Sequence, residues 1–111
     1  MKRNLDRIRG ILIEIENAKP LQDLQYEGDE DFYQIKLLLD AGFVVAEVYE
    51  DDATAYVERM TSKGHDFLDS IRDNTIWMKV KKYVNSTVGS VALSVLSDVA
   101  AGFARGKLGL L

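Results

Sequence analysis

The spacing of the apolar residues changes abruptly at Gly42, and this change sets the class of fold. Upstream of Gly42, apolar residues recur every three or four positions, which is the period of an amphipathic helix. Downstream, residues 43–50 (FVVAEVYE) and 56–60 (YVERM) are rich in β-branched and aromatic residues, which favours two strands around an acidic turn. Because a two-stranded hairpin is not stable alone in water, it must pack against the helices that flank it.

Two helices are predicted before the hairpin. The first covers residues 3–18 and ends at Pro20, because the proline ring disfavours a helical conformation at Lys19. The second covers roughly residues 30–41, and the acidic segment between the two, residues 21–31 (LQDLQYEGDED), is expected to be a loop. The apolar stripes are Leu5, Ile8, Ile11, Leu12, Ile15 and Ala18 in the first helix, and Phe32, Ile35, Leu38 and Leu39 in the second.

Three helices are predicted after the hairpin. Thr61 stands at the N-cap position of the first, which extends to about Asp73. A break at residues 74–75 leads into the second helix, and residues 85–87 separate that helix from a last one that begins near Val88. The apolar stripes are Phe67, Leu68 and Ile71 in the first of these helices, and Ile76, Trp77, Val80, Tyr83 and Val84 in the second.

The order of these elements predicts the fold class. Helix, loop, helix, two-stranded hairpin and further helices is the order of a mainly α, winged helix-turn-helix-like domain with a C-terminal helical extension. We expect residues 1–86 to form the winged-helix-like domain, and residues 87–111 to form a C-terminal helix used for packing or dimerisation.

Composition excludes several chemistries. The chain has 111 residues, no cysteine and a single histidine, so a disulfide framework, a thiolate metal site and a multi-histidine zinc cluster are all excluded. Charges recur throughout the first apolar stretch, which is unlike a signal peptide and favours a cytoplasmic location. The sequence therefore predicts a protein with no cofactor, no metal, no membrane association and no small-molecule substrate.

Residues 60–82 (MTSKGHDFLDSIRDNTIWMKVKK) resemble a family of uncharacterised proteins that are common in phages and prophages and form a domain of unknown function. The shared pattern is T-x-x-G-H-x-F-L-D-x-I-R-D-x-x-I-W. The opening MKRNLDRIR and residues 33–44 (YQIKLLLDAGFV) are similar to the same family, whereas the segment after Pro20 and the tip of the hairpin are not covered. The resemblance implies a winged-helix fold and a phage or bacterial cytoplasmic setting, and it brings no catalytic residue. The matched residues are Gly64, His65, Phe67, Leu68, Asp69, Ile71, Arg72, Asp73 and Trp77.

Two polar groups after the hairpin could carry chemistry, and we expect a structural role for each. His65 is flanked by Asp66 and Asp69, as a general base oriented by a carboxylate would be. It is accompanied by no nucleophile motif and no metal-ligand spacing. Asp69, Arg72 and Asp73 share one helix face, where an ion pair at the helix end is the simpler account. The sequence therefore predicts a non-enzymatic protein that acts by binding.

The charge distribution of the chain does not decide between DNA and a protein as the binding partner. The net charge is −4, but residues 21–60 hold two basic and eleven acidic side chains, and this segment contains the expected reading helix and wing. Winged helices that bind DNA place lysine and arginine against the phosphates there, so an acidic centre favours a basic protein partner. The basic ends of the chain leave DNA binding open through another face. A DNA-binding transcriptional regulator and a protein-interaction module, an adaptor or inhibitor, remain as alternatives. The expected contacts with DNA or a host or phage protein are Tyr33, Lys36, Leu37 and Asp40.

The last predicted helix is apolar around an arc of roughly 220°, which is wider than one core face requires. A membrane span explains this poorly, because the run is barely long enough and contains Asp98 and three serines. Burial on two sides is the better explanation, with a second copy of the chain covering one side. The sequence therefore predicts a homodimer, and the expected dimer contacts are Leu93, Leu96 and Ala100.

Overall fold

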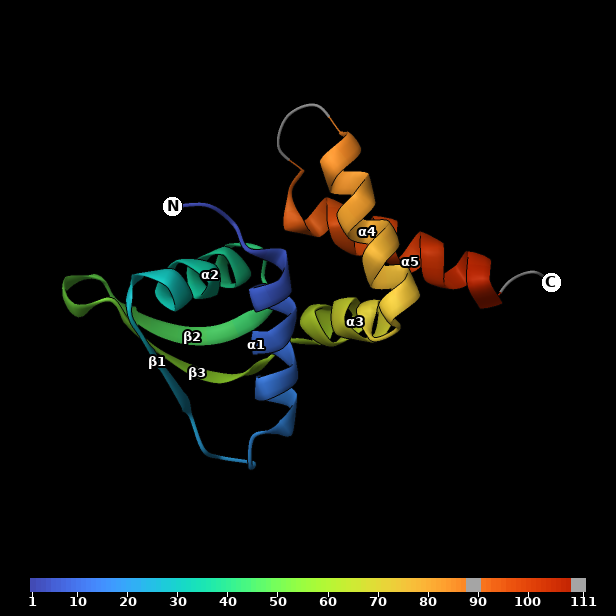
Figure 1. Cartoon of the computed structure of the whole chain (residues 1–111). Coiled ribbons are helices and arrows are strands. Elements are labelled where there is room, and N and C mark those ends of the chain that lie inside the picture. Colours follow the sequence, from blue (N-terminus) through green and yellow to red (C-terminus); the bar gives the residue numbers. More distant parts are fainter. Residues whose placement is uncertain (88–90, 109–111) are drawn as a thin grey trace. The chain divides into compact units, whose positions relative to one another are not determined.

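The computed structural model describes residues 1–87 and 91–108 (Figure 1). Within these residues the protein is mainly helical, with five α-helices and one three-stranded antiparallel sheet. Contacts between residues divide the chain into two compact units, Met1–His65 and Asp66–Leu111. The elements are α1 (Leu5–Asn17), β1 (Leu24–Glu27), α2 (Asp29–Asp40), β2 (Val44–Tyr49), the short 3-10 helix η1 (Glu50–Asp52), β3 (Thr54–Met60), α3 (Ser62–Ile71), α4 (Asn74–Ser86) and α5 (Leu93–Leu108).

The sheet contains a strand where the sequence analysis expected a loop. β1 pairs antiparallel with β3, from Leu24 opposite Val57 to Glu27 opposite Thr54, and the strand order is β1-β3-β2. The expectation of a loop was wrong because β1 is short and half polar, so it lacks the apolar run that marks a strand in sequence. Its hydrogen-bonded partner, rather than its own propensity, makes it a strand.

The predicted hairpin of β2 and β3 is confirmed. The two strands pair antiparallel, and the register shifts between Val45 and Ala46, where a β-bulge adds a residue to β3. Their connection is η1, followed by Ala53 in a left-handed conformation with a φ of 49°. The tip of the hairpin is therefore a compact helical turn that carries three consecutive carboxylates.

The core of the first unit lies between the sheet and the two helices α1 and α2. α1 contacts β3, α2 contacts β2, and the two helices also contact each other. The predicted stripes are confirmed at their centres, whereas Leu5, Ala18 and Leu39 at their ends are only half-buried. The buried residues of the stripes are Ile8, Ile11, Leu12 and Ile15 in α1, and Phe32, Ile35 and Leu38 in α2.

Arg7 joins three elements of this unit. Its Nε and Nη2 atoms donate to the two carboxylate oxygens of Asp31 on α2, each at 2.8 Å, and its Nη1 donates to Glu14 at 2.7 Å. The other oxygen of Glu14 accepts from the hydroxyl of Tyr26 on β1 at 2.8 Å. The bidentate hydrogen bonds from Arg7 lower the pKa of Asp31, while burial and the bond to Glu14 raise the pKa of Tyr26.

A buried glutamine fixes the N-terminal segment to α2. The amide of Gln34 is fully buried, and its Oε1 accepts from the backbone N–H of Asn4 at 2.8 Å. Its Nε2 donates to the carbonyl of Lys2 at 3.0 Å. Asn4 in turn caps α1, because its side chain accepts from the backbone N–H of Arg7 at 3.0 Å. The start of α1 is therefore held by α2 as well as by its own cap.

The glycine of the T-x-x-G-H pattern lies in the first turn of α3 and, within the first unit, closely approaches Phe43 and Met60. A Cβ atom on Gly64 would lie 2.2 Å from the carbonyl oxygen of Phe43 and 2.7 Å from Cγ of Met60. Thr61, the predicted N-cap, accepts from the N–H of Gly64 at 3.0 Å, and its hydroxyl donates to the carbonyl of Gly42 at 2.6 Å. The cap is confirmed, and no side chain fits at the glycine position.

The helix boundaries in the second unit differ from those expected. α3 ends at Ile71, and Asp73 caps α4 by accepting from the N–H groups of Thr75 at 2.8 Å and Ile76 at 3.1 Å. The expected break at residues 74–75 was wrong, because these residues belong to the first turn of α4, directly after the N-cap Asp73. α4 also extends through Ser86, part of the expected separator. The predicted start of the last helix near Val88 lies outside the described residues.

The core of the second unit includes α4 and α5, which contact each other. Trp77 is 3% exposed, which confirms it as a core residue, and the ammonium of Lys81 lies 5.8 Å from its ring centroid. α4 and α5 thus belong to one unit, while the division after residue 86 into separate domains stays a prediction. None of the described helices is both long enough and apolar enough to cross a bilayer.

The lowered pKa of Asp31 predicts how stability depends on pH. The ion pair with Arg7 contributes fully above the ordinary aspartate pKa of about 4, and this contribution is lost as the pH falls through the lower folded value. We expect Asp31→Asn to reduce the free energy of unfolding at neutral pH and to flatten its decline below about pH 4. Urea titrations at several pH values measure both effects. Asp29→Asn is the control, and an equal effect of the two substitutions would show that the pairing contributes nothing beyond charge.

The close approach at Gly64 predicts a large effect of one added methyl group. We expect Gly64→Ala to lower the free energy of unfolding by roughly 1 to 3 kcal/mol, because the backbone of Phe43 must move to make room. Gly102→Ala, at an open position inside α5, should instead stabilise the protein by about 0.5 to 1 kcal/mol. Urea unfolding followed by circular dichroism compares the two, and a neutral Gly64→Ala would mean that the contact is loose.

Candidate functional site

The residues expected to contact DNA or a protein partner lie on α2, and its one lysine is already paired. Tyr33, Lys36 and Leu37 are half-buried, and Asp40 is exposed. The ammonium of Lys36 lies 2.7 Å from a carboxylate oxygen of Glu50 at the tip of the hairpin, and 5.6 Å from the ring centroid of Phe32. The structure therefore brings helix and hairpin tip together through an ion pair, and the positive charge of α2 faces a carboxylate.

One face of the sheet is exposed and carries carboxylates and tyrosines; we call it the tyrosine face. Tyr56 lies between Gln25 of β1 and Glu47 of β2, and the neighbouring row places Thr54 between Glu27 of β1 and Tyr49 of β2. Thr54 itself is buried, whereas the other residues of these rows are exposed and alternate with buried or half-buried residues on the side of α1 and α2. The residues that define the tyrosine face are Gln25, Glu27, Glu47, Tyr49 and Tyr56.

Two tyrosines form the centre of this face. The rings of Tyr49 and Tyr56 are nearly perpendicular, at 83°, with centroids 5.8 Å apart. The hydroxyl of Tyr49 donates to Glu47 at 2.8 Å, and this bond raises the pKa of the phenol. With Asp52 and Thr54, the two rings line a hollow of about 400 Å³. Sequence reasoning used these tyrosines only as strand formers, although their alternation with buried residues placed them on the open face.

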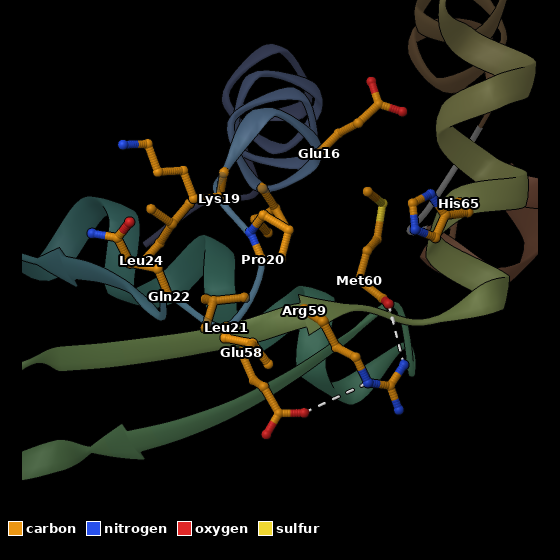
Figure 2. A pocket seen from close by; sticks show the side chains of 13 residues that line it. Glu16, Lys19, Pro20, Leu21, Gln22, Leu24, Glu58, Arg59, Met60 and His65 are labelled. Atoms are coloured by element: carbon orange, nitrogen blue, oxygen red, sulfur yellow. Dashed lines mark hydrogen bonds and ion pairs between the residues drawn. The ribbon is translucent and has the colours of Figure 1, made fainter.

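A second hollow of about 270 Å³ lies between the end of α1, the segment after it and the end of β3 (Figure 2). His65 and Met60 lie at one end of it, and the guanidinium of Arg59 contacts the carboxylate of Glu58 at 3.5 Å. Leu21 on its rim is fully exposed and has a φ of 64°, a strained value for leucine.

The chemistry available in this second hollow is limited. Its lining includes no serine, threonine or cysteine, so His65 faces no hydroxyl or thiol that it could activate there. No group of three acidic, histidine or cysteine side chains that could hold a metal ion is present among the described residues. The mixture of Glu16, Lys19, Glu58 and Arg59 also gives the hollow no dominant sign of charge.

The acidic cluster around Arg72 has the structural role that was expected. The Nε and Nη2 atoms of Arg72 lie 2.9 and 2.8 Å from Oδ1 of Asp69, which is one turn earlier in the chain. Asp73 caps the following helix, because its side chain accepts from the N–H groups of Thr75 and Ile76. The predicted ion pair at the helix end is confirmed, and both carboxylates are engaged in local structure.

The residues expected to form a dimer contact are buried inside the chain. Leu93 is 6% exposed, and Leu96 and Ala100 are fully buried, while α5 contacts α4. The prediction placed this flank on the outside because sequence gives the width of an apolar arc but not which side meets the rest of the chain. The exposed apolar residue of α5 is instead Val95, at 45% exposure. A homodimer stays a prediction, without these contacts.

Two substitutions on α5 separate core from surface. We expect Leu93→Glu to destabilise the protein by several kcal/mol, because it places a charge in a buried position. Val95→Glu, two residues away and exposed, should leave the stability within about 0.5 kcal/mol. Circular dichroism reports unfolding and light scattering reports mass. If Leu93→Glu instead gave a folded protein of half the mass, Leu93 would be a dimer contact, as the sequence analysis predicted.

Comparison with known proteins gives a family but no activity. The family described as "Hypothetical protein (DUF2513)" matches residues 2–90. An "Uncharacterized protein" of Haemophilus influenzae (strain ATCC 51907 / DSM 11121 / KW20 / Rd) is 32% identical over 109 residues, which cover 90% of this chain and 92% of the relative. No solved structure matches the chain significantly. With most of its length matched by the family and by this relative, the chain belongs to the DUF2513 family.

Proposed function

We propose that this chain is a non-enzymatic adaptor or inhibitor of phage or bacterial type, which binds a basic protein partner in the cytoplasm through its acidic first unit. The observation that carries the proposal is the 2.7 Å contact between Lys36 and Glu50. It neutralises the one basic side chain of α2 with a carboxylate from the hairpin tip. A partner that approaches α2 and the tip therefore meets a surface whose remaining charges are negative.

A winged-helix fold is part of the same proposal. α2 comes directly before the β2–β3 hairpin, as a reading helix comes before a wing, and α1 packs against both α2 and the sheet. In a DNA-binding member of that fold, these two elements carry the lysines and arginines that displace counterions from phosphates. Here the exposed side chains at the start of α2 and at the tip include Asp29, Glu30, Asp51 and Asp52.

DNA binding is the second candidate, and one observation favours it. α4 presents Lys79 and Lys82 as exposed residues and Lys81 as a half-buried one. The ammonium of Lys79 lies 6.0 Å from the ring centroid of Phe103 on α5. A row of lysines on one helix suits phosphate contacts, so a DNA-binding form of this protein would use α4 rather than α2.

Co-purification with and without nuclease separates the two candidates. We expect a tagged chain to retain a protein partner after nuclease treatment, and to lose it when Asp29, Glu30 and Asp51 are all changed to lysine, because the partner is then repelled. The control changes Lys79, Lys81 and Lys82 to glutamate and should leave the partner bound. Retardation of a DNA duplex at low salt, abolished by the α4 substitutions, would replace this proposal with the DNA-binding one.

A further inference from the structure

The tyrosine face provides a more specific inference, which rests on the proposed function. We infer that the hollow between Tyr49 and Tyr56 binds an arginine side chain from a basic segment of the partner protein. Tyr49 is 48% exposed and Tyr56 is 37% exposed, so both rings offer surface to an incoming group. Two nearly perpendicular rings form a corner, in which a planar cation can stack on one ring and meet the other.

The charges around the corner select a cation. Asp52 lines the hollow together with the two rings and Thr54. The carboxylate of Glu47 accepts a hydrogen bond from the hydroxyl of Tyr49. Glu27 lies in the same row of the sheet, opposite Thr54. A guanidinium that stacks on tyrosine can donate hydrogen bonds to such carboxylates at the same time, because it is planar and its N–H groups match the carboxylate oxygens. The ammonium of lysine lacks this planar geometry.

The rest of the sheet adds almost no positive charge. Arg59 is the one basic residue in the three strands, and it lies near the far end of β3, where it contacts Glu58. The strands and the hairpin tip otherwise contribute acidic groups. This charge complementarity argues for a basic occupant.

The same charges argue against other occupants of the face. A second copy of this chain would bring the same carboxylates to the face in a symmetric pair, and like charges would then oppose each other. Nucleic acid and an anionic membrane surface would be repelled for the same reason. A basic protein segment is the occupant that satisfies both the tyrosines and the carboxylates.

The corner is arranged before a partner arrives. The hydrogen bond from Tyr49 to Glu47 fixes the phenol, and the edge-to-face contact with Tyr56 fixes the second ring. Little side-chain freedom is therefore lost when an arginine enters, which favours affinity for a single side chain. Glu47 keeps an oxygen that can accept from the guanidinium while it holds the hydroxyl.

A short peptide tests the inference directly. The probe is a fluorescent peptide with three arginines separated by Gly-Ser, and matched peptides carry lysine or uncharged citrulline at the same positions. By fluorescence anisotropy we expect the arginine peptide to bind tightest and the citrulline peptide not to bind. We expect Tyr56→Leu to weaken the arginine peptide about fivefold, whereas Tyr56→Phe retains it, because the ring rather than the hydroxyl receives the cation.

Two matched controls distinguish the corner from general charge attraction. Tyr83→Leu changes a tyrosine of α4 that is 36% exposed, and it should leave peptide binding unchanged. Asp52→Asn should weaken binding, whereas Asp51→Asn removes the same charge from a neighbour that does not line the hollow and should have less effect. Circular dichroism establishes that each variant is folded, and Tyr49→Leu serves in place of Tyr56→Leu if the latter unfolds.

Three results would overturn the inference and leave the proposed function standing. The first is equal binding of the arginine and lysine peptides with no loss in either tyrosine variant. The second is an equal effect of the substitutions at Tyr56 and Tyr83. The third is a natural partner that still co-purifies with the folded Tyr56→Leu variant, although it is lost when Asp29, Glu30 and Asp51 are changed to lysine. A partner lost in both sets of variants supports the inference and the function together.

Discussion

The guanidinium of Arg7 is the group on which the first unit depends. It forms the bidentate pair with Asp31 of α2, and through Glu14 it is linked to Tyr26 of β1. Apolar stripes alone define the rotation and sliding of α1 against α2 only weakly. The two parallel hydrogen bonds from the guanidinium of Arg7 to the carboxylate of Asp31 require one relative position of the two helices. The bond from Tyr26 to Glu14 attaches β1 to the same network, while the backbone pairing with β3 makes β1 a strand.

The sequence predicted those elements whose apolar pattern is complete within themselves. α1, α2 and the hairpin were found because their buried residues recur with one period, and the cap at Thr61 because its side-chain chemistry is local. β1 was missed because its pairing partner lies about thirty residues away in the chain. The buried flank of α5 was assigned to a dimer because the side that meets α4 is decided only by tertiary packing.

Site prediction had the same limit. The expected contacts on α2 were chosen by helical periodicity, which placed Lys36 correctly on the outer face but could not show that Glu50 reaches it from the hairpin tip. The corner of Tyr49 and Tyr56 depends on strand register, and the register includes a bulge that composition does not reveal. Charge asymmetry between segments, by contrast, is visible from sequence, because it needs no knowledge of which residues meet.

Leu21 is an apolar residue that occupies a left-handed turn and buries none of its side chain. Its side chain is fully hydrated, and its left-handed backbone costs leucine on the order of 1 to 2 kcal/mol relative to an ordinary conformation. The turn that contains it reverses the chain between α1 and β1 within a few residues of Pro20. A glycine would adopt this turn without strain but would leave the unfolded chain more conformational freedom to lose. The strain at Leu21 is thus offset in part by the stiffer unfolded chain, by about 0.4 to 1 kcal/mol relative to glycine, so part of what leucine contributes at this turn lies in the denatured ensemble.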